Sequence, residues 1–340
     1  MAQPFDPDKL ALSGNPTAIA PGIEYVSTKS LGNFSVSENG ILVYRDSFVT
    51  PSRLVWLDRN GKELSTLGEA GVYNFARMSG DGNTIVLARQ DAVDPSKEDL
   101  WLMDTHRAAM SRLIFHPATF YSAAWSHDSR RLVVTSLGAK VQIIAANGSG
   151  TPTDVSLESL SRVTDWSPDG RTLVVGQQNA RTGWDIDLLP LAAQPQPVQT
   201  LLGSQFDEQG GRFSPDGRWL AYMSNESGRA EIYVVPFAGA GGRRQISNTG
   251  SATDFAGLTW SHDGKQIYYR DSSGALMVVD IQTLGNEIRA GIPRQFFSAV
   301  GGVRPISQTA DGRLLVMVPV QLGVVPPISM VMNWDAELKK

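Results

Sequence analysis

The chain has 340 residues, of which 41% are hydrophobic, a formal net charge of −4 and no cysteine. These values allow a large buried core, and they exclude disulfides, thiolate metal sites and cysteine nucleophiles. No run of lysine or arginine could neutralise a series of phosphates, so nucleic acid is not expected as a partner. No stretch approaches the length of a membrane span, which needs about eighteen apolar residues. The opening MAQPFDPDKLALSG lacks the pattern of a signal peptide.

In chain order, the first predicted element is a strand within residues 15–27, which precedes the first copy of a repeat. Each copy has an apolar residue, then Ser-x-Asp-Gly, then a short apolar run. A period of this length is typical of a four-stranded propeller blade. The first turn residues of the seven copies, 41 to 48 residues apart, are Ser37, Ser79, Ser126, Ser167, Ser214, Ser261 and Thr309.

The residue types of the repeat suit a tight turn between two strands. Serine can accept a hydrogen bond from the turn backbone, and aspartate tolerates the bridge region of backbone conformation. Glycine takes the positive φ that ends the turn. Two copies depart from the pattern, because Ser129 replaces a glycine and Asn39 replaces an aspartate. The turn aspartates are expected to be structural, and the aromatic residues before the turns are expected to form the core between blades: Trp125, Trp166, Phe213 and Trp260.

Further strands are predicted after each turn. A third strand is clear in segments such as LVWLD and EIYVVPF, and a weaker fourth strand follows in segments such as MSRLIF. The last copy supplies only three strands, so the N-terminal strand is expected to complete it by pairing with residues 327–334. The sequence therefore predicts an all-β fold, a single propeller of seven four-stranded blades, in one domain over residues 1–340.

The W-S-P-D-G-R repeats resemble those of TolB-like, WD-repeat-related propellers. More narrowly, the segment SPDGRWLAYMSNESGRAEIYVVPFAGAGGRRQIS and the two ends of the chain resemble the propellers that follow the kinase domain in bacterial receptor-like serine/threonine protein kinases. This resemblance implies a sensing or interaction module in the extracytoplasmic part of a membrane-anchored protein. The chain has no glycine-rich loop with its strand lysine and no HRD or DFG segment, so kinase activity is not expected of it.

Catalytic signals are sparse. A Gly-x-Ser-x-Gly elbow is missing from the sequence, which argues against a serine hydrolase. His127 and His262 occupy the proline position of the turn motif and are expected in surface turns, and His106 falls between a third and a fourth strand. His116 lies in a connection to an innermost strand and is the best placed of the four to line a site. No pair has metal-ligand spacing.

The candidate binding site is predicted at the channel mouth opposite the turns, because loops from the same step of each repeat should converge there. Asp207, Glu208 and Asp254 could hold calcium, which prefers several oxygen ligands; no other cofactor is expected. An alternative is that these loops are simply solvated, with the acids paired to the arginines. The predicted set is Asn74, Tyr121, Arg162, Asp207, Glu208, Asp254 and Arg304.

The leading functional prediction is a non-catalytic, monomeric propeller that binds a protein, a peptide or a small polar ligand as a sensor or scaffold. One alternative is a calcium-dependent propeller hydrolase that acts on a lactone or phosphoester with carboxylates at the channel mouth. Another is a solitary TolB-like interaction protein. A propeller fold by itself does not choose among them.

Overall fold

The residues fall into two compact units, a larger unit of Pro51–Val320 and a smaller unit that combines Met1–Thr50 with Gln321–Lys340. The sequence predicted one domain over residues 1–340, so this division differs from the expectation. The computed structural model describes residues 1–20, 23, 25–26, 31–45, 50–91, 94, 97–114, 119–136, 140–155, 157, 161–192, 196–237, 241–252, 257–320 and 328–337.

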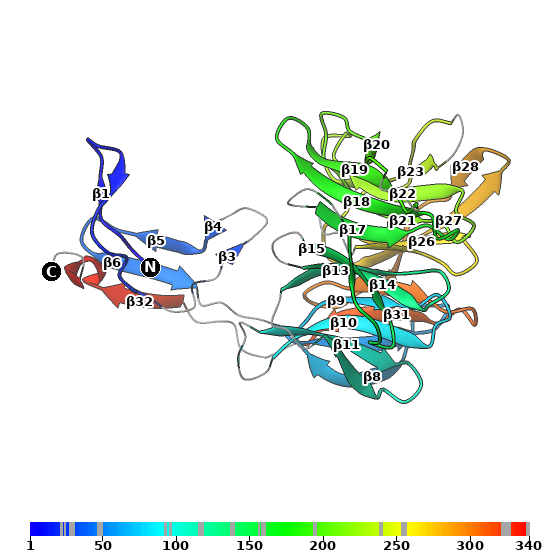
Figure 1. Cartoon of the computed structure of the whole chain (residues 1–340), viewed down its shortest axis with the longest axis horizontal. Coiled ribbons are helices and arrows are strands. Elements are labelled where there is room, and N and C mark those ends of the chain that lie inside the picture. Colours follow the sequence, from blue (N-terminus) through cyan, green and yellow to red (C-terminus); the bar gives the residue numbers. More distant parts are fainter. Residues whose placement is uncertain are drawn as a thin grey trace. The chain divides into compact units, whose positions relative to one another are not determined.

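The larger unit is built of antiparallel sheets that follow one another along the chain (Figure 1). Five of them use consecutive strands, since each apolar run returns through a tight turn to pair with the strand before it. In chain order these five sheets contain β9 (Tyr73–Met78), β10 (Thr84–Gln90), β11 (Glu98–Asp104) and β12 (Met110–Ile114); β13 (Phe120–Trp125), β14 (Arg131–Ser136), β15 (Lys140–Ala145) and β16 (Thr153–Val155); β17 (Ser161–Trp166), β18 (Thr172–Asn179), β19 (Gly183–Pro190) and β20 (Gln199–Leu202); β21 (Glu208–Phe213), β22 (Trp219–Ser224), β23 (Glu231–Pro236) and β24 (Arg244–Gln245); and β25 (Leu258–Trp260), β26 (Gln266–Arg270), β27 (Leu276–Leu284), β28 (Glu287–Ala290) and β29 (Arg294–Phe297).

The sixth sheet joins strands from both ends of the larger unit. β31 pairs with β7 from Leu314 opposite Leu57 to Pro319 opposite Ser52, and Figure 1 shows β31, in orange, beside the cyan strands. The predicted closure by an N-terminal strand on residues 327–334 is therefore corrected, because residues 328–332 pair with Ile41–Arg45. The order in the sixth sheet is β30 (Arg304–Gln308), β31 (Leu314–Pro319), β7 (Ser52–Leu57) and β8 (Glu63–Gly71).

The six sheets form a closed ring. Each innermost strand contacts the next, in the order β9, β13, β17, β21, β25 and β30, and β30 contacts β9. The described part of the larger unit thus forms a six-sheet propeller, where the sequence predicted seven blades. The difference arises because the repeat copy at Ser37 lies in the smaller unit, while the copy at Thr309 shares its sheet with β7 and β8.

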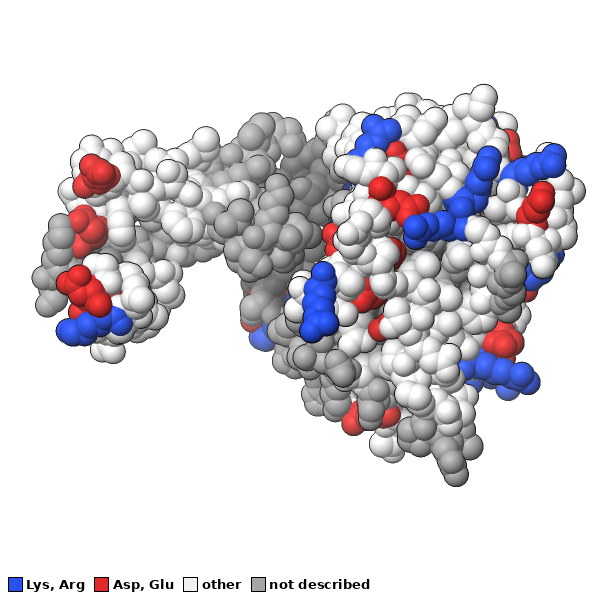
Figure 2. All heavy atoms as spheres, turned by 90° about the horizontal axis from the view of Figure 1, so that it is seen from above, with Lys and Arg blue, Asp and Glu red and all other residues white. Residues whose placement is uncertain are grey.

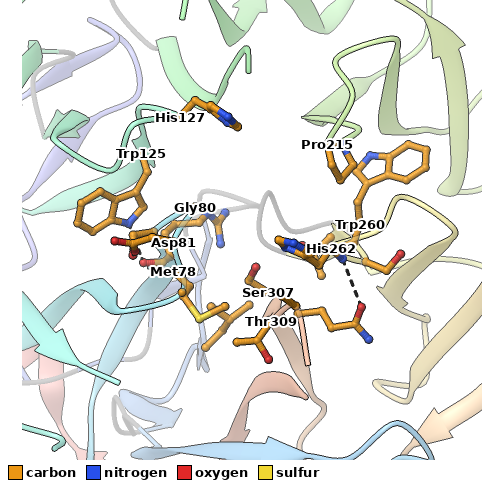
Figure 3. A pocket seen from close by; sticks show the side chains of 18 of the residues that line it. Met78, Gly80, Asp81, Trp125, His127, Pro215, Trp260, His262, Ser307 and Thr309 are labelled. Carbon is orange, nitrogen blue, oxygen red and sulfur yellow. Dashed lines mark hydrogen bonds between the residues drawn. The ribbon is translucent and has the colours of Figure 1, made fainter. Parts of the chain in front are cut away.

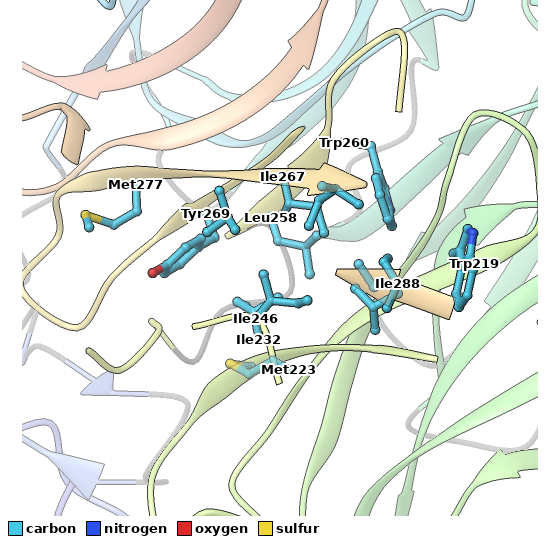
Figure 4. Close-up of a cluster of buried hydrophobic side chains, with 14 of the residues drawn as sticks. Trp219, Met223, Ile232, Ile246, Leu258, Trp260, Ile267, Tyr269, Met277 and Ile288 are labelled. Atoms are coloured by element: carbon cyan, nitrogen blue, oxygen red, sulfur yellow. The ribbon is translucent and has the colours of Figure 1, made fainter. Parts of the chain in front are cut away.

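Six clusters of buried apolar side chains fill the spaces between neighbouring sheets, one at each boundary of the ring. Figure 4 shows the cluster between the β21–β24 sheet and the β25–β29 sheet, where Trp260, Ile267 and Trp219 lie close together. The aromatic residues predicted to form this core are buried: Trp125, Trp166, Phe213 and Trp260. Burial of side chains this large supplies much of the driving force for closing the ring.

The repeat turns have the predicted chemistry. The hydroxyl of Ser167 donates to Asp169 Oδ1 at 2.6 Å and accepts from the backbone N–H of Thr172 at 2.9 Å. These contacts lower the pKa of Asp169, chiefly through the serine hydroxyl and then through the N–H of Arg171. Ser129 stands at the glycine position with φ of 56°, and its hydroxyl accepts from the backbone N–H of Asp81 in the neighbouring sheet at 3.2 Å.

The smaller unit contains a three-stranded sheet in the order β32-β6-β5 and two short hairpins. The turn at Ser37 joins β5 to β6, and its serine hydroxyl donates to the side chain of Asn39, as in the larger unit. None of the described residues belongs to a helix with the length and hydropathy of a membrane span. The elements are β1 (Phe5–Asp6), β2 (Ala11–Leu12), β3 (Tyr25–Val26), β4 (Leu31–Gly32), β5 (Phe34–Val36), β6 (Ile41–Arg45), β32 (Ile328–Met332) and the 3-10 helix η1 (Trp334–Glu337).

Candidate functional site

A cavity of about 530 Å³ opens at the end of the ring where the Ser-x-Asp-Gly turns lie, which we call the turn side. Every innermost strand ends at such a turn, so residues from the same step of each repeat meet around one opening. Figure 3 shows side chains from several sheets around it, with His127, Pro215 and Thr309 on different sides. All six sheets contribute to the lining.

One repeat position supplies the wall of this cavity just below the turns. It lies two residues before the first turn residue. Because side chains alternate along a strand, the residue at this position faces the channel while the following residue, aromatic in four of the six sheets, packs between blades. The residues at this position that line the cavity are Arg77, Ala124, Asp165, Arg212, Thr259 and Ser307.

Three of these wall residues carry charge. Asp165 Oδ2 accepts a hydrogen bond from the backbone N–H of Phe213 at 2.7 Å. Burial raises the pKa of Asp165, against the opposing effect of Arg212 and, more weakly, Arg77. Burial also lowers the pKa of Arg212, against the effect of Asp165. Two guanidinium groups and one carboxylate leave this wall with a net positive charge when all three are ionised.

Indole groups fix the strands that carry the two arginines. Trp260 donates its Nε1–H to the backbone carbonyl of Arg212 at 3.1 Å, and Trp125 donates to the carbonyl of Arg77 at 3.0 Å. In both cases the donor comes from the next sheet in the ring. Hydrogen bonds between sheets therefore hold the backbone of each arginine in place, which reduces the entropy lost when a ligand binds.

Three histidines lie at the opening of the cavity, namely His106, His127 and His262. Their predicted positions in exposed turns are confirmed. The backbone N–H of His262 donates to Gln308 Oε1 at 3.3 Å (dashed in Figure 3), and His106 Nε2 lies 3.2 Å from Asn83 Oδ1. His116 lies outside the described residues.

On the opposite side of the ring, the structure brings two predicted site residues together. The guanidinium of Arg162 stacks over the ring of Tyr121, with its carbon 4.9 Å from the ring centre, and also over Trp184 at 5.4 Å. Burial lowers the pKa of Arg162. Both aromatic contacts are within the range of cation–π interactions.

Two further predicted residues, Asn74 and Arg304, also meet on that side. Arg304 Nη1 donates to the backbone carbonyl of Asn74 at 3.3 Å, and Asn74 Nδ2 donates to the carbonyl of Phe120 at 2.8 Å. These bonds connect three consecutive sheets. Nearby, Glu98 Oε1 accepts from the backbone N–H of Phe120 at 2.6 Å, and burial raises the pKa of Glu98 to about 7.

The two described acids of the predicted calcium set hold segments where the β17–β20 sheet connects to the β21–β24 sheet. Asp207 Oδ1 accepts from the backbone N–H of Trp184 at 2.9 Å. Glu208 is fully buried and accepts from the hydroxyl of Ser204 at 2.5 Å. Asp254 lies outside the described residues. Among the residues that the structure describes, no group of three or more histidines, aspartates or glutamates is placed to hold a metal ion.

Sequence reasoning placed the site at the other mouth and did not single out Arg77 or Arg212. The signal that could have found them is a charged residue next to a core position in an otherwise apolar strand, as in the segments ARMSGDG and GRFSPDG. A charge in such a strand needs a polar surface to face, and residues of every innermost strand line the turn-side cavity.

No family model matches the chain, and no curated protein matches it. Among solved structures, the chain is similar to a protein assigned as TolB from Agrobacterium tumefaciens, at 14% identity and a TM-score of 0.61, over 80% of this chain and 99% of that one. It is also similar to TolB from Acinetobacter baumannii, at 17% identity and a TM-score of 0.52, over 72% of this chain and 65% of that one. Hydrazine synthase from Kuenenia stuttgartiensis matches at 12% identity and a TM-score of 0.54, over 88% of this chain and 94% of that one. The chain therefore has a TolB-like β-propeller fold.

Proposed function

We propose that the larger unit is a non-catalytic binding propeller whose turn-side cavity takes a carboxylate-bearing ligand, such as a peptide with a free C-terminus. The observation that carries this proposal is the presence of Arg77 and Arg212 in the cavity wall beside one carboxylate, Asp165. Arginine is well suited to such a ligand because its planar guanidinium can form two parallel hydrogen bonds with a carboxylate.

The cavity has the size and lining that a small ligand group needs. Its volume of about 530 Å³ lies within the usual range for ligand pockets of about 300–1,000 Å³. Trp56, Trp125 and Trp260 also line this opening, although most of each side chain is buried between blades. A carboxylate would meet the arginines, while the rest of the ligand would contact the rim.

Charge at the outer surface suits a protein or peptide partner better than a polyanion. On the face that Figure 2 presents, cationic and anionic side chains of the larger unit are interspersed, and the net charge of the chain is −4. Together with the repeat resemblance, this supports a role as a sensor or scaffold module of the kind joined to bacterial serine/threonine kinases.

The proposal is tested by calorimetric titration with N-acetyl-tetraalanine, which has a free carboxylate, and with its C-terminal amide. We expect the carboxylate peptide to bind at least about tenfold more tightly than the amide, because a charged hydrogen bond is lost in the amide. Arg77→Gln should abolish this difference, and Arg53→Gln, which removes an exposed arginine paired with Glu63, should keep it. Equal binding of the two peptides by the wild type would refute a carboxylate site.

A further inference from the structure

The wall and the rim of the turn-side cavity repeat after three sheets of the ring. An arginine, a tryptophan and a histidine recur 135 positions later in the chain, and all six residues line the cavity. Because the ring has six sheets, a shift of three sheets places the members of each pair on opposite sides of the opening, as Figure 3 shows for Trp125 and Trp260. We call the two sides the Arg77 half-site and the Arg212 half-site. The pairs are Arg77 and Arg212, Trp125 and Trp260, and His127 and His262.

The backbone beside the two arginines has the same geometry. Ser79 and Ser214, two residues after the arginines, donate their N–H groups to the neighbouring strand at 2.8 Å. Successive N–H groups of an antiparallel strand point to opposite sides, so the N–H groups of Met78 and Phe213 point away from that strand. β9 and β21 are the innermost strands of their sheets, and these two N–H groups therefore face the open inner edge of each sheet.

At the Arg212 half-site, a carboxylate of the chain itself occupies this edge. Asp165 Oδ2 accepts from the N–H of Phe213 at 2.7 Å. Asp165 comes from β17, in the sheet that precedes that of Arg212 in the ring. Burial raises the pKa of Asp165, and Arg212 opposes this rise more strongly than Arg77 does. Asp165 therefore belongs to the Arg212 half-site.

At the Arg77 half-site, the equivalent wall residue is a serine. β30 precedes β9 in the ring, and Ser307 on β30 lies two residues before its turn, as Asp165 does. Their strand pairing agrees, since Ser307 lies opposite Leu315 and Asp165 lies opposite Val174, in each case two residues beyond the pair that closes the turn. A serine side chain is shorter than that of aspartate and has no charge, so this wall position supplies no carboxylate to the edge of β9.

The guanidinium of Arg77 lies at the same edge of β9. Arg77 Nη1 donates to the carbonyl of Ala76 at 3.1 Å. This carbonyl points to the same side as the N–H of Met78, because both groups alternate with those that pair with β10. A guanidinium has five donors, so it can hold this carbonyl and a ligand carboxylate together. The Arg77 half-site thus offers a guanidinium, a backbone N–H and a serine hydroxyl to one anion.

We propose that the ligand carboxylate binds at the Arg77 half-site, in the place that Asp165 takes on the opposite side. Ser307 is the residue that selects for this binding. The carboxylate accepts from the N–H of Met78, from Arg77 and from the hydroxyl of Ser307. This rests on the proposed function and deepens it, since one ligand carboxylate is assigned to the ring and one residue to its selection. A second carboxylate at the opposite half-site would meet the negative charge of Asp165.

Two variants that add the same charge to the same wall test the proposal. Ser307→Asp gives the Arg77 half-site a carboxylate of its own, and Thr259→Asp places one in the sheet next to Arg212. Each is titrated calorimetrically with N-acetyl-tetraalanine and with its C-terminal amide. We expect Ser307→Asp to lose the preference for the carboxylate peptide, a loss of at least about tenfold. Thr259→Asp should reduce the preference less than about threefold, because a charge farther from the ligand acts more weakly.

A rescue experiment does not depend on the folding of Ser307→Asp. Arg77→Gln should lose the preference for the carboxylate peptide. Asp165→Ser in that background should restore the preference to about tenfold, because it opens the equivalent place beside Arg212. Asp311→Asn in the same background also removes a carboxylate that lines the cavity, and it should not restore the preference.

The outcomes separate the two proposals. Equal binding of the two peptides by the wild type refutes the carboxylate site as a whole. If the wild type prefers the carboxylate peptide, a folded Ser307→Asp that keeps this preference, or an equal loss in Thr259→Asp, overturns the assignment to the Arg77 half-site alone. That assignment is also overturned if Asp165→Ser does not restore the preference in Arg77→Gln, or if Asp311→Asn restores it equally.

Discussion

Trp260 donates its indole Nε1–H to the backbone carbonyl of Arg212, at 3.1 Å, across the boundary between two sheets of the ring. A tryptophan that packs between two blades therefore also holds the backbone of a cavity residue in place. Trp125 and Arg77 repeat the relationship at another boundary, at 3.0 Å. The two arginines of the proposed ligand site are the two wall residues held in this way among the described hydrogen bonds.

Replacing Trp260 with phenylalanine should destabilise the larger unit through the loss of this hydrogen bond. Trp219→Phe is the matched control, because Trp219 is also buried and its Nε1 has no hydrogen-bond partner among the described residues. We expect Trp260→Phe to lower the free energy of unfolding by about 1 kcal/mol more than Trp219→Phe, since a buried carbonyl is left without its donor. Urea denaturation measures the difference, and equal losses in the two variants would show that the bond contributes little.

The turn glycines should matter for their backbone conformation. Gly170 has φ of 73° and no atom near the position of a β-carbon, so Gly170→Ala should cost about 1 kcal/mol from the positive φ alone. Gly242 is equally open and does not have a positive φ, so Gly242→Ala should be neutral within about 0.5 kcal/mol. Thermal denaturation of the pair checks this, and similar effects of both changes would contradict the turn geometry.

The buried carboxyl of Glu98 predicts a dependence of stability on pH. Burial raises its pKa from 4.5 to about 7. Below pH 4.5 the carboxyl is neutral in the folded and the unfolded chain. Between pH 4.5 and 7 the unfolded chain releases its proton first, so the free energy of unfolding falls as the pH rises, and above pH 7 the full cost is present.

Glu98→Gln removes this titration and keeps an oxygen that can accept from the N–H of Phe120. We expect the variant to match the wild type at pH 4 and to be more stable than the wild type at pH 8. Urea midpoints at several pH values give the comparison. A constant difference across this range would mean that Glu98 does not titrate as proposed.

Closure of the ring should depend on β31 and β7 and not on the N-terminal residues. Removing residues 1–28 leaves every strand of the larger unit in place, so its melting temperature should not change. Leu315 is fully buried at the seam opposite Trp56, and Leu315→Ala should cost about 2–5 kcal/mol. Calorimetry of the two variants tests the closure, which would be contradicted if the truncation lowered the melting temperature and the substitution did not.

The repeat could be predicted from the sequence because its turn residues have a local physical role. Ser167, Asp169 and Gly170 each satisfy a requirement of one tight turn, and the burial of Trp166 follows from strand alternation. The closure could not be predicted in the same way. From the sequence, the strand of Trp56 could be the third strand of the blade that begins at Ser37 or of the blade that begins at Thr309. Only long-range packing decides between these two assignments.

The candidate site was harder to predict than the fold. Strand alternation could place Arg77 and Arg212 on the channel side, but whether a mouth of the channel forms a cavity depends on how loops from six sheets fill it. The predicted acids Asp207 and Glu208 illustrate the difficulty, since their partners Trp184, on β19, and Ser204, in the connection before β21, are brought close to them only by the fold. Sequence spacing alone does not show such partners.

The central claim is tested most directly by the affinity of N-acetyl-tetraalanine for the wild type and for two variants that differ in charge at the cavity wall. Asp165→Asn removes the one negative wall charge and keeps an acceptor for the N–H of Phe213, whereas Arg77→Gln removes one positive charge. We predict that calorimetry gives binding about tenfold tighter than wild type for Asp165→Asn and about tenfold weaker for Arg77→Gln, at low salt, where such charges act most strongly. The same affinity for all three proteins, or the reverse order, would contradict an anion site formed by these residues.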